Sequence, residues 1–370
     1  MSFRILLPSF LLFICSAPAA QAQTDTLRLL FAGDVMGHTP QISSAQTAPG
    51  KYDYHPCFEF IQPIVEQADI AVANLELTLP GRAPYTGYPM FRSPDALAEA
   101  LRDAGFDILV TANNHSNDSR GAGLVSTIET LRQLGLQQTG TFKNQRERDL
   151  FYPLMVYKNG FKLALLNYTY GTNGVATQAP TIVNLIDTVQ MAHDLAEARA
   201  RKPHFVIAIM HWGLEYQLEE NAEQRERARF LIRNGADLII GAHPHVVQPI
   251  KTETVRLADG SEKSALVVYS LGNFISNQQQ PGTDGGILFE IELLHRAGAP
   301  YAEVGRYGYR PVWRYVEKNA GKTLFRVLPA APYDRQPDAA PGPTVDALKS
   351  MRRYAESVRQ RLKGCQELER

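Results

Sequence analysis

The alternation of short apolar runs with helical stretches limits this chain to one class of fold. Six apolar runs have the length and residue types of buried strands, and four intervening segments carry apolar residues at helical spacing. Such alternation is typical of layered α/β folds, so we predict an α/β protein. The runs occupy residues 27–32, 70–73, 108–111, 163–166, 205–210 and 238–240, and the helical segments occupy residues 94–104, 121–134, 185–200 and 219–234.

The pattern changes after residue 245. Residues 246–256, 264–270 and 286–294 are predicted strands, with a hairpin turn at residues 258–260. A strand-rich stretch, a proline-rich stretch and an amphipathic helical stretch follow. We therefore predict a main domain at residues 26–295, a strand extension at 296–328, a linker at 329–343 and a C-terminal helix at 344–370.

The first residues have the composition of a secretory signal. Arg4 precedes an apolar stretch at residues 5–14, and Ala20-Gln21-Ala22 provides a small-x-small cleavage site. We predict that residues 1–22 form a cleavable signal peptide and that the protein is exported to the periplasm or cell envelope. An uncleaved membrane anchor is the alternative.

The charged residues exclude one large class of partners. Lys and Arg together number 38, and Asp and Glu together number 38, which gives a formal net charge of +0. A chain without a basic field has no long-range attraction for nucleic acid, so we expect recognition at a local site. Cys57 and Cys365 form no Cys-x-x-Cys pattern. We expect them to be unpaired thiols, with a disulfide as the alternative.

Five of the apolar runs end in side chains that can bind a metal ion. The carboxyl ends of strands in an open α/β sheet form the usual ligand site, so these side chains should converge. Carboxylate, amide and imidazole donors suit Mn, Fe or Zn, and a carboxylate can bridge two cations. Each residue alone would also fit a helix cap, a turn or a buried histidine. Their recurrence at successive strand ends favours a site for one or two divalent ions. In chain order the residues are Asp34, Glu76, Asn114 followed by His115, His211, His243 and His245.

With these residues identified, the sequence resembles the poly-γ-glutamate capsule-synthesis (CapA-like) family, whose domain is similar to calcineurin-like metallophosphoesterases. The resemblance covers residues 27–289 and implies a four-layer α/β/β/α sandwich with a dinuclear metal centre. The motifs that carry it are Gly33-Asp34-Val35-Met36, Asn74-Leu75-Glu76, Ala112-Asn113-Asn114-His115 with Asp118, His211-Trp212-Gly213, Gly241-Ala242-His243-Pro244-His245 and Tyr269-Ser270-Leu271-Gly272-Asn273-Phe274.

The resemblance also implies roles for individual residues. His115 is the implied catalytic acid or oxyanion partner, with Asp118 as a second catalytic residue. Met36 departs from the phosphoesterase pattern, because it stands where those enzymes have a histidine ligand. One of the two metal sites is therefore expected to have one nitrogen ligand fewer. The implied metal ligands are Asp34, Glu76, Asn114, His211, His243 and His245.

Loops that follow the predicted strands should form the walls of a cleft. The resemblance implies an exported metal-dependent hydrolase or transferase that acts on a cell-envelope polymer such as poly-γ-glutamate, or on another anionic substrate, with capsule-synthesis membrane proteins as partners. A non-catalytic component that binds an anionic polymer during capsule export is one alternative, and a generic exported phosphoesterase is another. The predicted substrate contacts are Asn113, Tyr170, Asn173, Glu215, Tyr216 and Asn273.

Overall fold

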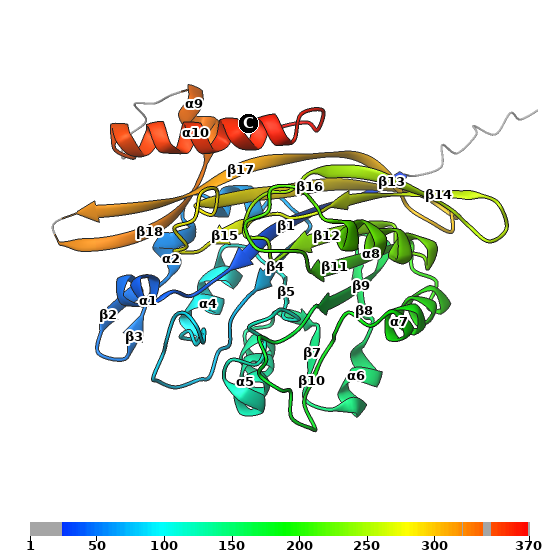
Figure 1. Cartoon of the computed structure of the whole chain (residues 1–370), viewed down its shortest axis with the longest axis horizontal. Helices are drawn as coiled ribbons and strands as arrows, with labels where there is room; N and C mark the ends of the chain where they lie inside the picture. Colours follow the sequence, from blue (N-terminus) through cyan, green and yellow to red (C-terminus); the bar gives the residue numbers. More distant parts are fainter. Residues whose placement is uncertain (1–23, 320, 336–341, 369–370) are drawn as a thin grey trace, which may run out of the picture.

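The computed structural model describes residues 24–319, 321–335 and 342–368 (Figure 1). The predicted signal peptide at residues 1–22 lies outside these ranges. Within them, no helix is both long and apolar enough to cross a membrane. Cys57 and Cys365 are both free thiols, as predicted.

The larger of the two main sheets has eight strands and is built around β1 (Thr24–Val35). Its strand order is β18-β17-β16-β1-β4-β5-β6, and β15 pairs with β1 outside this path. Strands β1, β4, β5 and β6 run parallel, whereas β16, β17 and β18 run antiparallel to their neighbours. The bounds are β4 (Ile70–Leu75), β5 (Ile108–Val110), β6 (Gln137–Thr139), β15 (Asn273–Ile275), β16 (Gly285–Arg296), β17 (Glu303–Asn319) and β18 (Lys322–Pro329).

The second sheet has six strands in the order β13-β14-β12-β11-β9-β8. Its four central strands run parallel, and the edge strands β8 and β13 are antiparallel to them. The bounds are β8 (Leu154–Lys158), β9 (Phe161–Thr169), β11 (Phe205–His211), β12 (Leu238–Ala242), β13 (Ile250–Arg256) and β14 (Glu262–Val268). Two small pairs are formed by β2 (Gln46–Ala48) with β3 (Lys51–Tyr52) and by β7 (Thr141–Phe142) with β10 (Ile182–Val183).

The four helical segments predicted before residue 245 correspond to α4, α5, α7 and α8, and the predicted C-terminal helix corresponds to α10. Shorter helices connect the strands of both sheets. The bounds are α1 (Thr39–Ala45), α2 (His55–Phe58), α3 (Gln62–Val65), α4 (Ala96–Asp103), α5 (Arg120–Gln133), α6 (Gln145–Phe151), α7 (Thr188–Ala200), α8 (Ala222–Arg233), α9 (Ala330–Arg335) and α10 (Val345–Arg361).

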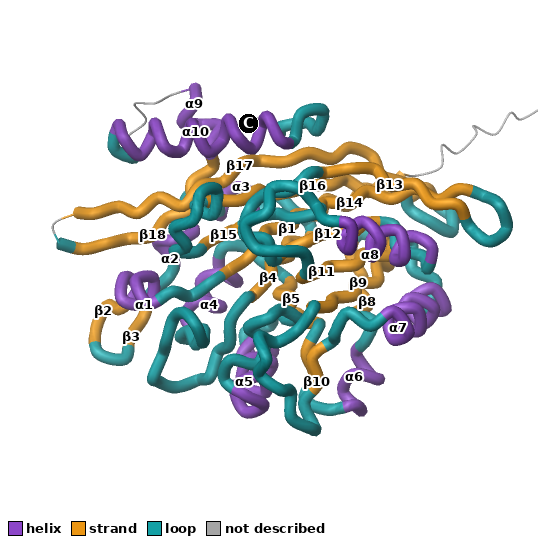
Figure 2. The backbone as a smooth tube through the Cα atoms, viewed as in Figure 1, coloured by secondary structure: helices purple, strands orange, loops and turns teal. Residues whose placement is uncertain are grey.

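Alternating side chains along β1 show how the layers are stacked. Leu27, Leu29 and Phe31 face a central core shared with the second sheet, whereas Leu30 and Ala32 face a core formed with helices α1 to α4. A third core joins the outer face of the second sheet to α7 and α8. Figure 2 shows the strands in the middle, with α1, α2 and α4 on one side and α7 and α8 on the other. The predicted four-layer α/β/β/α sandwich is confirmed.

The strands predicted as an extension at residues 296–328 continue the larger sheet. β17 pairs with β16, and β18 pairs with β17. Helix α10 covers this hairpin, and its residues Leu348, Met351 and Tyr354 join the central core (Figure 1). The stretch predicted as a linker at residues 329–343 contains α9, and residues 336–341 of it lie outside the described ranges.

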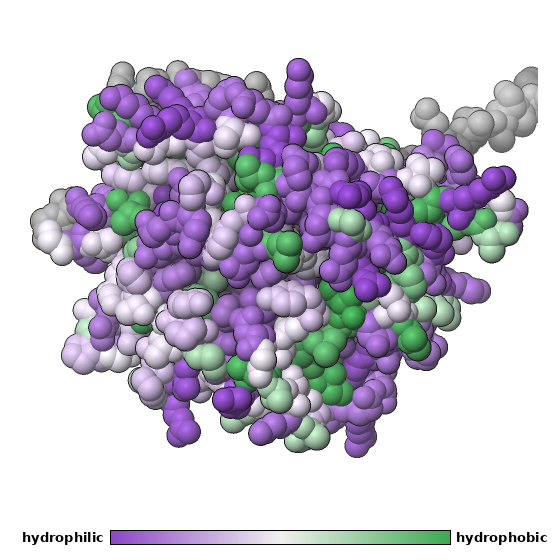
Figure 3. All heavy atoms as spheres, viewed as in Figure 1, coloured by the Kyte–Doolittle hydropathy of each residue, from purple (hydrophilic) through white to green (hydrophobic). Residues whose placement is uncertain are grey.

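The surface drawn in Figure 3 is mostly hydrophilic, with hydrophobic side chains gathered between α5 and α7. At the beginning of α7 itself, Val189 is 81% exposed, and Leu185 shortly before it is 49% exposed. Exposed apolar side chains that lie close together are typical of surfaces that contact a ligand or another macromolecule.

Candidate metal centre

The six predicted metal ligands lie together at the carboxyl ends of strands from both sheets. Asp34 lies near the end of β1, Glu76 directly follows β4, and Asn114 follows β5. His211 is the last residue of β11, and His243 and His245 follow β12. All six side chains are buried. The site therefore spans the junction between the two sheets.

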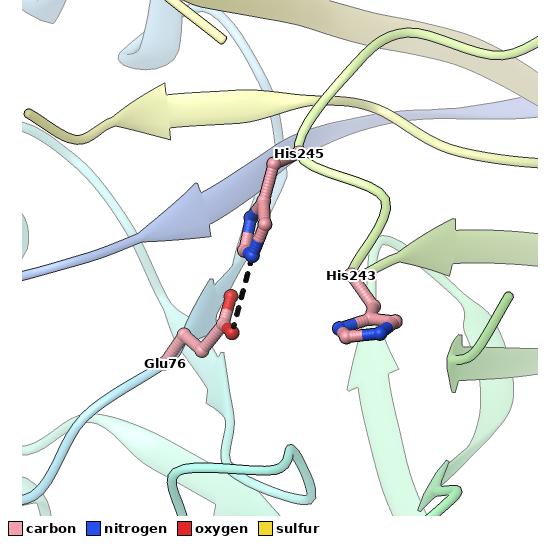
Figure 4. A group of neighbouring side chains, drawn as sticks. All are labelled: Glu76, His243 and His245. Carbon is pink, nitrogen blue, oxygen red and sulfur yellow. Dashed lines mark ion pairs between the residues drawn. The ribbon is translucent and has the colours of Figure 1, made fainter. Parts of the chain in front are cut away.

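Five of the six form two overlapping groups that can each hold a cation. Asp34, Glu76 and His211 make one group, and Glu76, His243 and His245 make the other. Within each group the candidate ligand atoms all lie within 4.8 Å of one another. Figure 4 shows the carboxylate of Glu76 pointing at the His245 ring, with the His243 ring to the right of both. Because Glu76 belongs to both groups, it has the position of a bridging ligand.

The chemistry of Glu76 fits a cation site. Both of its carboxylate oxygens are buried without a hydrogen-bond partner among the described residues, and so is Nδ1 of His243. Burial, together with the nearby Asp34, raises the pKa of Glu76 well above its usual value. A buried carboxylate without a partner is costly, and divalent cations would remove that cost. The residues present therefore fit one or two divalent ions.

Hydrogen bonds fix the orientation of His245. Its Nδ1 lies 3.1 Å from Oδ2 of Asp34 and 3.1 Å from Oδ1 of Asn273. Nε2 then faces Oε1 of Glu76 at 3.9 Å. Burial alone would lower the pKa of His245, but the carboxylates of Glu76 and Asp34 raise it to about 9. Without a metal this ring therefore carries a proton at neutral pH, and a metal ion that binds Nε2 would displace that proton.

His211 is held from both sides of its ring. Nε2 lies 2.9 Å from Oδ1 of Asn114 and 3.5 Å from Oε1 of Glu76, while Nδ1 lies 3.2 Å from Nδ2 of Asn74. Burial lowers the pKa of His211 to about 3, so the ring is neutral at physiological pH. A neutral imidazole is the form that binds metal.

The backbone around His243 and His245 adopts a conformation that is rare for residues with side chains. His243 has φ 98° and His245 has φ 60°, with Pro244 between them. Such left-handed conformations in non-glycine residues cost about 1–3 kcal/mol each and cluster at functional sites. The loop therefore holds both imidazoles in place at the expense of backbone strain.

His115 and Asp118 form a buried pair beside the predicted ligands. Nδ1 of His115 lies 2.7 Å from Oδ2 of Asp118, and Nε2 lies 3.4 Å from Nδ2 of Asn173. Donation from Nδ1 to the Asp118 carboxylate leaves a lone pair on Nε2. Asp118 also accepts a hydrogen bond from the backbone of Phe91. Asp118 was predicted to be catalytic; this geometry makes it a positioning residue for His115.

Four of the six predicted substrate contacts lie at the mouth of the site. Tyr170 has its ring 4.6 Å from that of His243, and Oε1 of Glu215 lies 3.9 Å from Nε2 of His245. Nδ2 of Asn114 donates a hydrogen bond to Oδ1 of Asn173 at 3.3 Å. Nε2 of Gln278 donates to the hydroxyl of Tyr216 at 3.4 Å.

The other two predicted substrate contacts, Asn113 and Asn273, have their side chains inside the protein. Asn113 is fully buried and donates to the carbonyl of Leu75 at 2.7 Å, so it braces the loop that carries Asn114. Asn273 is also buried; its Oδ1 pairs with His245, and its Nδ2 donates to the carbonyl of Thr283 at 2.8 Å. Both amides are hydrogen-bonded within the protein and orient other residues of the site.

Sequence reasoning missed the role of Asn74. Its Nδ2 donates to Oδ1 of Asp34 at 2.7 Å and lies next to His211, so one amide orients ligands from both sheets. Its place at the end of β4, two residues before Glu76, was the available signal. Met36 packs in the core beneath helices α1 to α4. The position of the first-motif histidine is thus occupied by a side chain of the apolar core.

A comparison with known protein families shows the family to which this chain belongs. The family described as "Bacterial capsule synthesis protein PGA_cap" matches residues 28–278. The chain belongs to this family. All six predicted ligands lie within the matched residues.

Two curated relatives are capsule proteins of bacilli. The chain is 25% identical over 293 residues to "Capsule biosynthesis protein CapA" of Bacillus anthracis, covering 75% of this chain and 66% of that protein. It is 25% identical over 302 residues to "PGA biosynthesis protein CapA" of Bacillus subtilis (strain 168), covering 78% of this chain and 72% of that protein. The chain thus spans about two thirds of the first relative.

A solved structure supports the fold assignment. The NAD nucleotidase (NadN) of Haemophilus influenzae superposes with a TM-score of 0.50 at 11% sequence identity, covering 90% of this chain and 63% of that one. At this identity the likeness concerns the fold alone. The fold of this capsule-synthesis family member is metallophosphoesterase-like, as its sequence motifs implied.

Proposed function

We propose that this chain is an exported, metal-dependent hydrolase or transferase that acts on an anionic cell-envelope polymer such as poly-γ-glutamate. The observation that carries the proposal is the position of Glu76. It is common to two groups of candidate metal ligands, and both of its oxygens are buried without a hydrogen bond among the described residues. A purely structural carboxylate would be expected to have a hydrogen-bond partner.

The proposed function assigns cation binding to six residues of the site. Asp34, Glu76, His211, His243 and His245 would hold the cations, and Asn114 lies beside His211 as a further oxygen donor. Bound divalent cations supply positive charge that polarises a substrate carbonyl or phosphoryl oxygen.

His115 would transfer a proton to or from the substrate. Asp118 fixes its Nδ1 at 2.7 Å, so that Nε2 is the ring atom able to exchange a proton with a substrate. Tyr170, Asn173 and Glu215 would form the rim against which the substrate lies.

The substrate class is supported by the relatives. Both curated relatives carry capsule or PGA biosynthesis in their names. The signal-like composition of residues 1–22 supports export to the periplasm or cell envelope, where such polymers are handled. Capsule-synthesis membrane proteins are the proposed partners.

The experiment combines metal analysis with turnover. The purified mature protein is reconstituted with Mn, Fe or Zn, and bound metal is measured alongside cleavage or transfer of poly-γ-glutamate. His243→Ala should lose both metal and turnover. His115→Ala should keep its metal and lose turnover by about 10²–10⁴-fold. His193→Ala, a change at an exposed histidine of α7, serves as the control and should alter neither. Absence of stoichiometric metal from the wild type would overturn the proposal.

The same assay separates the alternatives. Turnover of a simple phosphate ester without action on the polymer would identify a generic phosphoesterase instead. Polymer binding without any turnover, equally strong in His115→Ala, would identify a non-catalytic binding component.

A further inference from the structure

A pocket of about 470 Å³ opens beside the candidate metal centre. His243 and Tyr170 lie on the side of the pocket next to the metal ligands, and Trp212 and Leu214 supply apolar walls. Arg227 of α8 also lines it. A molecule that reaches the metal centre past His243 would therefore have room for a further group in this pocket.

Arg227 is an unusual arginine in this structure. Its side chain is only 29% exposed, yet Nε is buried without a hydrogen-bond partner among the described residues. Nη2 lies 3.9 Å from Oε1 of Glu223, which is beyond hydrogen-bonding distance. The Glu223 side chain is itself 72% exposed. Neither Nε nor Nη2 therefore has a hydrogen-bond acceptor in the part of the chain that the structure describes.

The other arginines nearby on α8 have acceptors. Nη1 of Arg225 donates to the carbonyl of Glu220 at 2.9 Å, and Nε of Arg229 donates to Oε2 of Glu253 at 3.2 Å. Arg227 lies between them in sequence and faces the pocket instead. Because Nε is buried, a ligand in the pocket would meet the Nη end of this guanidinium.

We propose that this pocket is a subsite that binds a carboxylate of an extended anionic substrate through Arg227. The two Nη groups at the end of the guanidinium match the two oxygens of a carboxylate and can bind them with two parallel hydrogen bonds. Trp212, Leu214 and Tyr170 would contact the methylene groups between neighbouring carboxylates.

The acidic residues of the pocket do not compete for this role. Glu215 lies against Nε2 of His245 at 3.9 Å, and the carboxylate of Glu223 is turned largely to solvent. Arg227 is thus the positively charged side chain among the residues that line the pocket. The inference rests on the proposed function, since it names the polymer group that is held while another part of the chain lies at the metal centre.

The experiment measures binding rather than turnover. Isothermal titration of the metal-loaded full chain uses two probes, a γ-linked glutamate pentamer and the same pentamer with its free side carboxylates converted to carboxamides. Arg227→Gln should weaken binding of the carboxylate probe about 10–100-fold and leave the carboxamide probe unchanged. Arg227→Lys should restore only part of the loss, because an ammonium group lacks the planar fork. Arg233→Gln, an exposed position on the same helix, removes the same charge outside the pocket and should change neither affinity.

Three results would overturn the inference. These are unchanged binding of the carboxylate probe by Arg227→Gln, an equal loss for both probes, and a wild type that binds neither probe. Failure of the proposed function is distinguishable from these results. A wild type without metal or turnover that still binds the carboxylate probe in an Arg227-dependent way would overturn the enzyme proposal and support the subsite.

Discussion

Two buried glutamates in this protein have different surroundings. Neither oxygen of Glu76 has a hydrogen-bond partner among the described residues, whereas one oxygen of Glu220, Oε1, lies 2.6 Å from Nζ of Lys251. Burial raises the pKa of Glu76 well above its usual value, so ionisation of this group opposes folding. The cost is absent below the pKa of the unfolded chain and grows as the pH rises above it.

Glu76→Gln should therefore stabilise the metal-free protein. Replacing the carboxylate by a neutral amide should raise the free energy of unfolding at neutral pH by about 1–3 kcal/mol. Glu220→Gln should lower it, because that change breaks an ion pair. Urea denaturation in the presence of a chelator measures both. With Mn added, the wild type should instead be more stable than Glu76→Gln, since only the wild type keeps the carboxylate shared by both groups of ligands. A metal-free Glu76→Gln less stable than wild type would contradict this account.

His38 provides a pH prediction. Burial lowers its pKa to about 4, and Nδ1 accepts a hydrogen bond from the backbone N–H of Asn277 at 3.1 Å. The unfolded chain binds this proton with a pKa of about 6.5, so stability is lost as the pH falls below that value and the loss continues down to the folded pKa. His38→Asn keeps a side-chain acceptor without the proton.

The stability difference between wild type and His38→Asn isolates this histidine. From pH 7 to pH 5 the wild type should lose about 2 kcal/mol of unfolding free energy relative to His38→Asn. Urea denaturation of the two metal-free proteins at both pH values measures the difference. A difference that does not change with pH would show that His38 binds its proton equally well in the folded and unfolded states, which would contradict a lowered pKa.

At the scale of single residues, the sequence was informative wherever a polar side chain directly followed an apolar run. Asp34 and His211 were found in this way. Asn113 and Asn273 were predicted to contact substrate, but position after a strand does not reveal whether an amide faces the cleft or, as here, donates to the protein's own backbone. The role of Asn74 depends on contacts with Asp34 and His211, which lie far away in sequence.

At the scale of elements, the predicted strands and helices were largely recovered, but their pairing was not predictable. β1 runs antiparallel to β16, with Leu27 opposite Leu293, although more than half of the chain separates them. Local periodicity carries no information on such distant partners. Helix α9 was missed for a local reason, because a proline-rich stretch favours a linker by composition.

An arginine of β17 contacts residues that in turn support the metal centre. Nη1 of Arg314 donates to Oδ1 of Asn277 at 3.1 Å, and Nη2 donates to the carbonyl of Gln278 at 3.4 Å. Oε1 of Gln278 accepts from Nδ2 of Asn273 at 2.8 Å, and Asn273 orients His245. A chain of hydrogen bonds thus links the C-terminal strands to a predicted ligand.

Arg314→Gln should therefore weaken metal binding although Arg314 is not a predicted ligand. Loss of outer contacts to a ligand typically lowers metal affinity about 10–100-fold, and we expect the lower end because two residues intervene. Competition with a chromophoric chelator measures the affinity. Arg306→Gln changes an exposed arginine of the same strand and should leave it unaltered. Equal metal affinity in the wild type and Arg314→Gln would exclude the link.

At the scale of the whole molecule, the candidate metal centre is the place where side chains of the two sheets meet. Asp34 and Glu76 extend from the larger sheet, and His211, His243 and His245 extend from the second. Each candidate group of ligands draws on both sheets. The apolar core between the sheets provides most of their contact, but a bound cation would add a direct cross-link at one edge.

Metal binding should therefore stabilise the entire sandwich. A ligand that binds only the folded state adds about 2.7 kcal/mol when its free concentration is 100 times its Kd. Thermal unfolding with Mn and with a chelator measures this gain. Removing a ligand from either sheet, by Asp34→Ala or by His243→Ala, should abolish most of it, whereas the exposed His193→Ala should retain it fully. If the His243→Ala protein kept the full metal-dependent increase in Tm, the cation would be bound elsewhere, and the two sheets would be held together by the apolar core alone.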